Sequence, residues 1–304
     1  MTPVSIRYNA AVTHEGIEDR SAAAAIARSF VMARRNAKSL PGFPGAIPRN
    51  LEAAYLCQNL AIDAWPDRLI GWKVGMIAPS LRETLGSDRV AGAIFEGGLR
   101  GARDRVEFPV FVGGFAAVEA EFVLRIAHDA PADKIDWTPR EAQALVGAMH
   151  IGVETAGSPL ATINELGPTV VAADFGNNAG LILGPEIQDW AAQQLESLTA
   201  VTSIEGKIVG RGNAGVLPHG PIGALQFLAA QTARMGRPLK AGMLVSTGAV
   251  TGVHDIQVGQ HAFADFGVHG GISGVAVAAT CTDAATCASG ATPAAGATRA
   301  AGAT

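Results

Sequence analysis

The chain has 304 residues, of which 48% are hydrophobic and 16% are charged, and its formal net charge is −4. This composition is typical of a globular protein with a substantial core, and the absence of a Lys/Arg cluster argues against nucleic acid as the main partner. No apolar run approaches the roughly 20 residues of a membrane span. The stretch SAAAAIARSFVMARR lacks a signal-peptide core because arginines interrupt it. We therefore expect a cytoplasmic protein without a membrane partner.

Helical patterns occupy the N-terminal part of the chain. Residues 1–18 are interpreted as a flexible leader, and residues 19–66 as a helical segment. Two helices are expected there, because the prolines and glycines of SLPGFPGAIP interrupt the pattern between them. The second helix is predicted to begin after Asn50 as its N-cap and to end before Pro66.

From residue 67 the pattern changes to short strands, glycines and turns, and residues 67–278 are predicted to form the catalytic domain. VEAEFVLRIA predicts a strand, VTSIEGKIVGRG a hairpin and GPIGALQFLAAQTARMG a helix. TPREAQALVGAM predicts a helix over 138–149, with a capping box between Thr138 and Glu141. This mixture indicates an α+β domain with a mixed or antiparallel sheet. Residues 279–304 repeat Gly-Ala-Thr and are predicted to be a disordered tail.

The strand at 115–126 carries two glutamates on one face. Strand side chains alternate, so Glu119 and Glu121 point the same way while Val118 and Phe122 face the opposite side. One interpretation is a solvated polar face with Arg125 as counter-charge. The other is a divalent-metal site, since hard cations bind clustered carboxylates, and Glu154 in the apolar segment HIGVETAGSPL is a candidate third ligand.

A lysine between glycines, Lys73 in GWKVG, has two interpretations as well. It is either a surface lysine at a β-bulge or a cation placed where the backbone can approach a ligand closely. A cation in that position suits a carboxylate or a developing enolate.

Seven motifs occur in one order over about residues 20–277, and together they carry a resemblance. They are AYLCQ, GWKVG, VEAEFVLRI, VETAGSP, VAADFGNNAGLILG, GRGNAGVLPHGPIGALQFLA and LKAGMLVSTG. In order and spacing the chain resembles the 2-keto-4-pentenoate hydratase and 4-oxalocrotonate decarboxylase family, within the fumarylacetoacetate hydrolase superfamily. The resemblance implies an α+β fold with a curved mixed β-sheet and flanking helices.

The resemblance also implies a set of site residues. Glu119, Glu121 and Glu154 match the family's carboxylate ligands for Mg²⁺ or Mn²⁺. Lys73 matches the active-site lysine and is expected to be both catalytic and substrate-binding, and Asp174 matches an acidic residue that opens a loop near the site and is expected to be catalytic. The sequence Thr247–Gly248 matches a Thr-Gly pair that approaches the substrate.

The implied activity is that of a metal-dependent hydro-lyase. It adds water to a 2-hydroxy-2,4-dienoate of the 2-oxo-4-pentenoate type and gives a 4-hydroxy-2-oxo acid, as in aromatic catabolism. The alternatives are decarboxylation of a 2-oxo-3-hexenedioate, with Arg125 or Arg211 as candidates for a second carboxylate, and acylpyruvate-type C–C hydrolysis. A non-catalytic partner of a related hydratase or decarboxylase is a further alternative, and the resemblance also implies a homo-oligomer.

The chain departs from the family pattern at two places. Val90 stands near the position of a common loop acid, for which Asp88 is the candidate substitute. Pro159 follows Gly157–Ser158 where relatives often have arginine. Both departures remove groups that are expected to orient water or hold the substrate. Neither of them removes a metal ligand.

Overall fold

The computed structural model of the chain describes residues 14–103 and 105–282. The predicted leader up to residue 13 and the predicted tail from residue 283 lie outside the described residues. The helices are α1 (His14–Arg35), α2 (Leu51–Ala64), α3 (Pro79–Leu85), α4 (Pro139–Gln143), α5 (Pro168–Ala173) and α6 (Gly220–Arg234). The strands are β1 (Leu69–Met76), β2 (Arg89–Phe95), β3 (Leu99–Gly101), β4 (Val106–Val110), β5 (Phe115–Ile126), β6 (Val146–Ser158), β7 (Asn178–Glu186), β8 (Thr199–Ile204), β9 (Lys207–Asn213), β10 (Leu244–Ser246), β11 (His254–Asp255), β12 (His261–Asp265) and β13 (Gly271–Ala278).

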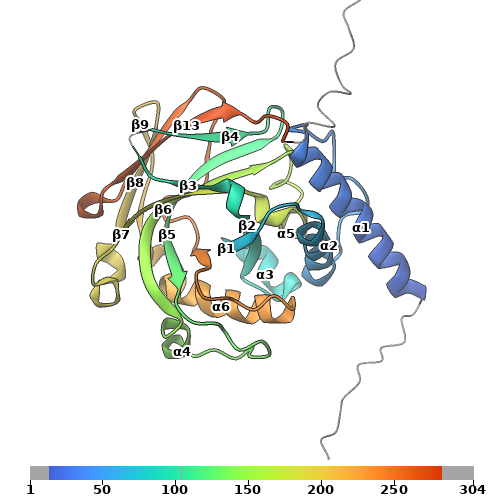
Figure 1. Cartoon of the computed structure of the whole chain (residues 1–304), viewed down its shortest axis with the longest axis horizontal. Helices are drawn as coiled ribbons and strands as arrows, with labels where there is room; N and C mark the ends of the chain where they lie inside the picture. Colours follow the sequence, from blue (N-terminus) through green and yellow to red (C-terminus); the bar gives the residue numbers. More distant parts are fainter. Residues whose placement is uncertain (1–13, 104, 283–304) are drawn as a thin grey trace, which may run out of the picture.

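The larger sheet is mixed and curved, and it forms the framework of the molecule (Figure 1). Its strand order is β2-β1-β10-β5-β6-β7-β3, with β11 paired to β5. The pairs β1–β10 and β3–β7 are parallel and the others are antiparallel. Helix α6 packs against this sheet at β1, β2 and β5, while α1 and α2 lie side by side on another flank (Figure 1).

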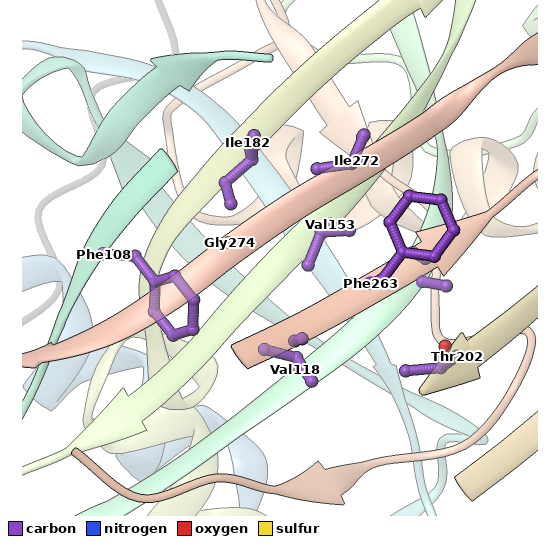
Figure 2. Close-up of a pocket in the computed structure, with 11 residues that line it drawn as sticks. Phe108, Val118, Val153, Ile182, Thr202, Phe263, Ile272 and Gly274 are labelled. Atoms are coloured by element: carbon purple, nitrogen blue, oxygen red, sulfur yellow. The ribbon is translucent and has the colours of Figure 1, made fainter. Parts of the chain in front are cut away.

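The smaller sheet, in the order β4-β13-β12-β8-β9, covers one face of the larger sheet. Figure 2 shows the apolar layer between them, where Val118 and Val153 of the large sheet meet Phe108, Ile272 and Phe263 of the small one. The space left in this layer is about 10 Å³. That is at most enough for one water molecule, so this layer is a packed core. A functional site on the large sheet is therefore expected on its opposite face.

Helix α2 covers the exposed edge of the large sheet at β2. Asn50 caps the helix by accepting a hydrogen bond from Ala53 N at 2.9 Å, as predicted. The Tyr55 hydroxyl accepts from Ala91 N at 3.0 Å, and Gln58 Nε2 donates to Ala91 O at 3.0 Å. These bonds satisfy edge groups that would otherwise be open to another strand.

Two sequence predictions about local structure were wrong in their extents. Helix α1 begins at His14 rather than at residue 19 and ends at Arg35. The capping box of Thr138 and Glu141 is present, but α4 stops at Gln143, residues 144–145 form a turn, and the predicted helix over 146–149 is instead the start of β6. Pairing with β5 along its whole length overrides the local helical pattern there. The predicted hairpin is confirmed, with left-handed Glu205 and Gly206 at its turn.

Among the described residues, no helix is both long enough and apolar enough to cross a membrane.

Candidate metal centre

Three glutamates meet on the concave face of the large sheet. Glu119 of β5 pairs directly with Glu154 of β6, and Glu121 follows two residues along the same face of β5. One carboxylate oxygen from each lies within 4.8 Å of the others, and the three residues are 0–5% exposed. The interpretation of Glu119 and Glu121 as a solvated polar face is therefore wrong.

Neighbouring side chains fix the orientation of two of these carboxylates. Glu121 Oε2 accepts hydrogen bonds from Ser246 Oγ at 2.6 Å and from Gly248 N at 2.8 Å. Glu154 Oε1 accepts from Asn178 Nδ2 at 2.9 Å. Of the remaining oxygens, Glu121 Oε1 is buried and makes no hydrogen bond, whereas Glu154 Oε2 is buried 3.3 Å from the ammonium group of Lys73.

Buried carboxylate oxygens without a hydrogen-bond donor are destabilising. A hard divalent cation prefers oxygen ligands of this kind and would neutralise their mutual repulsion. The three-glutamate cluster therefore fits Mg²⁺ or Mn²⁺, with Glu119, Glu121 and Glu154 as the residues able to hold the ion.

The nearest cation of the chain is Lys73, which is 3% exposed and not a surface lysine. Its Nζ lies 3.3 Å from Glu154 Oε2 and donates a hydrogen bond to Asn177 Oδ1 at 3.2 Å. The register of β1, β10 and β5 places Lys73 on the same face as Ser246 and the glutamates. The predicted lysine and the three predicted carboxylates thus form one site.

The pKa values of the site reflect burial and crowded charge. Burial, with the charge on Glu154 adding and that on Lys73 opposing, raises the pKa of Glu119 to about 7. Burial and the other two carboxylates raise the pKa of Glu121 well above its ordinary value. For Lys73, burial lowers the pKa, but the charges of Glu154, Glu119 and Glu121 outweigh burial and raise it above the ordinary value. The amine is therefore protonated at neutral pH.

A short left-handed turn covers Lys73. Phe175, Gly176 and Asn177 form the 3₁₀ turn η2 (Phe175–Asn177), and all three have positive φ, between 51° and 63°. A Cβ atom at Gly92 of β2 would stand 2.1 Å from Phe175 O, and one at Gly176 would stand 3.1 Å from Lys73 Cδ. The two glycines therefore permit the turn to lie directly on β2 and on the lysine side chain.

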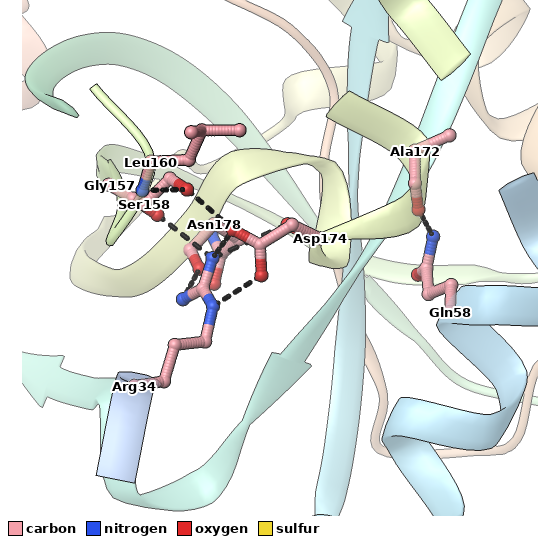
Figure 3. A network of polar contacts seen from close by, with 8 residues as sticks. All are labelled: Arg34, Gln58, Gly157, Ser158, Leu160, Ala172, Asp174 and Asn178. Atoms are coloured by element: carbon pink, nitrogen blue, oxygen red, sulfur yellow. Dashed lines mark hydrogen bonds and ion pairs between the residues drawn. The ribbon is translucent and has the colours of Figure 1, made fainter. Parts of the chain in front are cut away.

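Asp174, predicted to be catalytic, lies at the start of this turn and is fully engaged (Figure 3). Its two carboxylate oxygens accept from Arg34 Nε at 2.6 Å and Nη2 at 2.9 Å, and Oδ2 also accepts from Ser158 Oγ at 2.6 Å. Both carboxylate oxygens are engaged within the protein, and this geometry suits an anchoring role.

Thr247 and Gly248, predicted to bind substrate, hold the backbone and Glu121. Thr247 Oγ1 donates to Phe122 O at 2.7 Å, and Gly248 N donates to Glu121. Gly248 has a φ of +116°, which favours glycine.

The predicted Asp88 does not join the cluster. It lies four residues, or about 13 Å of strand, beyond Gly92, the partner of Lys73, and its carboxylate pairs with Arg89 Nη1 at 2.6 Å. Val90 is the residue of this segment that approaches the site. Its Cγ2 and Lys73 Nζ lie 3.3 and 3.6 Å from the place where a Gly75 Cβ would stand.

The arginines proposed for a second carboxylate lie elsewhere. Arg125 is exposed, four residues or about 13 Å along β5 from Glu121. Arg211 is exposed on β9 of the smaller sheet.

Sequence reasoning missed four residues that complete the site: Arg34, Asn177, Asn178 and Ser246. The two asparagines and the serine stand within the motifs VAADFGNNAGLILG and LKAGMLVSTG, so those motifs held the signal. No sequence motif indicated the role of Arg34, because it lies 140 residues from its partner Asp174.

No protein-family model matches the chain. Curated relatives do match it: a 2-keto-4-pentenoate hydratase of Paraburkholderia phymatum is 28% identical over 203 residues, covering 65% of this chain and 75% of the relative. A 2-keto-4-pentenoate hydratase of Paraburkholderia xenovorans is 25% identical over 229 residues, covering 74% and 83%. The chain is a homologue of 2-keto-4-pentenoate hydratases.

Solved structures agree on the fold of this homologue. The 4-oxalocrotonate decarboxylase of Pseudomonas putida G7, complexed with calcium and acetate, superposes with a TM-score of 0.68 at 20% identity, over 85% of this chain and 98% of that one. A fumarylpyruvate hydrolase of Pseudomonas aeruginosa, in complex with Mn²⁺ and pyruvate, gives a TM-score of 0.50 at 15% identity, over 70% and 91%. The resemblance and the predicted fold class, a curved mixed sheet with flanking helices, are confirmed.

Proposed function

We propose that the chain is a divalent-metal-dependent hydro-lyase that adds water to a 2-hydroxy-2,4-dienoate and yields a 4-hydroxy-2-oxo acid. The observation that carries this proposal is the buried cluster of three glutamates beside Lys73, in which Glu121 Oε1 lacks a hydrogen-bond donor. The homology to 2-keto-4-pentenoate hydratases names the substrate class.

In this proposal Glu119, Glu121 and Glu154 hold Mg²⁺ or Mn²⁺. The bound cation supplies a Lewis acid that attracts the substrate's carboxylate and C2 oxygen and stabilises negative charge there. Ser246 and Asn178 keep two of the carboxylates from rotating, since each donates a hydrogen bond to one of them. Preorganised ligands of this kind do not have to reorient when charge develops.

Lys73 is the proton-carrying group of the site. Its Nζ is protonated and is held by Glu154 and Asn177, so it enters the reaction as a proton donor. Ketonisation of the dienol moves one proton from the C2 hydroxyl to C5: Lys73 donates its proton to C5 and then takes up the proton of the C2 hydroxyl, which restores its charge. Water then adds across C3 and C4, with its hydroxyl on C4 and its proton on C3.

The other predicted residues take supporting roles in this proposal. Asp174, Thr247 and Gly248 position the turn and Glu121, and Asp88 takes no part in the chemistry. Val90 gives the wall beside Lys73 an apolar surface, which suits a hydrocarbon portion of the substrate.

The oligomeric state and cellular location are proposals as well. We propose a cytoplasmic homo-oligomer, able to associate with a related hydratase or decarboxylase. Light scattering of the purified chain, alone and mixed with such an enzyme, measures the mass of each assembly.

The test is product analysis by NMR with 2-hydroxypenta-2,4-dienoate, 2-oxo-hex-3-enedioate and an acylpyruvate, each with Mg²⁺, Mn²⁺ or chelator. Metal-dependent formation of 4-hydroxy-2-oxopentanoate supports the proposal. Release of CO₂ from the diacid alone would instead identify a decarboxylase, and C–C cleavage a hydrolase. Stoichiometric metal binding without turnover of any of the three would indicate a non-catalytic partner.

A further inference from the structure

The side chain of Arg34, on the N-terminal helix α1, contacts segments that adjoin the metal centre. It is 7% exposed and makes hydrogen bonds to four groups other than water, all of them in segments around residues 157–178. A buried guanidinium needs most of its five N–H groups satisfied. The N–H groups of Arg34 donate to Gly157, Asp174 and Asn178 and not to residues of its own helix.

Arg34 forms hydrogen bonds to the residues on both sides of the turn η2 (Figure 3). At the start of the turn the guanidinium binds both oxygens of Asp174, at 2.6 and 2.9 Å. At the end of the turn Nη1 donates to Asn178 O at 2.8 Å. Nη2 also donates to Gly157 O at 3.0 Å, which ties the turn to the end of β6, the strand of Glu154.

The turn η2 has an unfavourable backbone conformation, which the contacts of Arg34 help to hold. Phe175 and Asn177 are two non-glycine residues in the left-handed region, a conformation that side chains disfavour and that persists only where the surrounding structure holds it. Phe175 stacks against the Arg34 guanidinium, whose Cζ is 5.2 Å from the ring centroid. The arginine therefore contacts the strained residue as well as both ends of the turn.

The last two residues of the turn contact the reactive centre. Asn177 Oδ1 accepts from Lys73 Nζ at 3.2 Å, and Asn178 Nδ2 donates to Glu154 Oε1 at 2.9 Å. Any shift of the turn moves both contacts at once.

We infer that Arg34 is a positioning residue of the active centre: by clamping residues 174–178 it sets the orientation of Lys73 through Asn177 and of Glu154 through Asn178. The part that concerns turnover rests on the proposed function, whereas the part that concerns Glu154 stands on metal binding alone. The N-terminal helical segment is on this account a component of the site and not only a flank of the fold.

The variant that tests this inference is Arg34→Lys. Lysine keeps the positive charge but cannot bind the two oxygens of Asp174 and Asn178 O in one plane. We expect Mn²⁺ affinity to fall about tenfold and kcat to fall on the order of 10- to 100-fold, the range typical of residues that orient metal ligands. We expect KM to change less than about threefold. Mn²⁺ binding is measured by electron paramagnetic resonance without substrate.

A double-mutant cycle separates positioning from general stability. Combined with Asn178→Ala, Arg34→Lys should produce little further loss of Mn²⁺ affinity, because both changes remove the same constraint on Glu154. If the two contacts acted independently, the fold-losses of affinity in the single variants would multiply in the double variant. The matched control is Arg237→Lys, which disturbs another arginine bridged to the helical segment through Asn59 and Asp63, away from the site. This control should retain wild-type Mn²⁺ affinity and kcat.

Folded Arg34→Lys protein with wild-type Mn²⁺ affinity, or losses that multiply in the cycle, would overturn the inference. If Arg34→Lys does not fold, Asp174→Asn replaces it, since it keeps the shape of the side chain and weakens its ion pair with Arg34. Unchanged Mn²⁺ affinity in folded Asp174→Asn then overturns the inference. If the wild-type chain binds Mn²⁺ but does not hydrate the dienoate, the proposed function fails while the Mn²⁺ cycle still decides the role of Arg34.

Discussion

Replacing Glu119 by glutamine should have opposite effects on stability and on metal binding. Glu119 is 5% exposed, and its carboxylate oxygen lies within 4.8 Å of oxygens from Glu121 and Glu154. Two unit charges at that distance repel by about 3 kcal/mol at an effective dielectric constant of about 20. Glu119→Gln preserves the shape of the side chain and removes the charge. The new amide can donate to the buried oxygen Glu121 Oε1, which has no donor.

The magnitude follows from the pKa of Glu119, which rises from 4.5 to about 7 in the folded protein. A carboxyl whose folded-state pKa is raised favours folding fully below pH 4.5 and loses this contribution as the pH rises through about 7. At about 1.4 kcal/mol per pH unit, ionisation of Glu119 destabilises the metal-free protein by about 3 kcal/mol at pH 8.5. Glu119→Gln should therefore be about 3 kcal/mol more stable than the wild type at pH 8.5 and nearly equal at pH 5.

The assay is urea unfolding of both proteins at pH 5 and pH 8.5 in the presence of chelator, followed by Mn²⁺ titration of the native proteins. The variant should lose most of its Mn²⁺ affinity and its turnover. A variant that is destabilised by the same amount at both pH values, or that binds Mn²⁺ as tightly as the wild type, would refute the reasoning.

Three further outcomes are expected. Glu154→Gln should weaken Mn²⁺ binding markedly in titrations while the circular dichroism spectrum keeps its native form; unchanged affinity would exclude Glu154 as a ligand. Lys73→Met should lower kcat at least about 100-fold with Mn²⁺ still bound, because it removes the proton carrier and no carboxylate; kcat within a few-fold of wild type would remove Lys73 from the mechanism. The Cys57 thiol, 2% exposed with a pKa raised to about 11 by burial, should react with a thiol reagent at pH 8 only after unfolding, and comparison with Cys57→Ser identifies its signal; rapid reaction of the native thiol would contradict its burial.

The site could be predicted from the sequence where the chemistry lies within one strand. Alternation along 115–126 placed Glu119 and Glu121 on one face, because strand periodicity is a local property. Local reasoning could not choose between a solvated face and a metal site. The choice depends on Glu154, which pairing of β6 with β5 brings beside Glu119; its apolar segment made it a candidate third ligand, and the family resemblance favoured the metal site.

The errors and omissions have the same physical origin. Residues 146–149 carry a helical pattern, yet the long antiparallel pairing with β5 makes them a strand. The family resemblance predicts Asp174 as a catalytic residue, and its ion pair with Arg34 was missed because Arg34 is far away in sequence. Contacts over such separations are decided by the packing of α1 on the sheet, which no local pattern encodes.

The most direct test of the central claim, a three-glutamate metal centre that supports hydration, is turnover measured against metal occupancy. Chelator-treated protein is titrated with Mn²⁺ while 2-hydroxypenta-2,4-dienoate consumption and bound Mn²⁺ are recorded together, for wild type and Glu119→Gln. The account predicts that turnover rises in proportion to one bound Mn²⁺ per chain and that Glu119→Gln shows neither binding nor turnover over that range. Turnover of the dienoate that is undiminished in chelator-treated wild-type protein would contradict it.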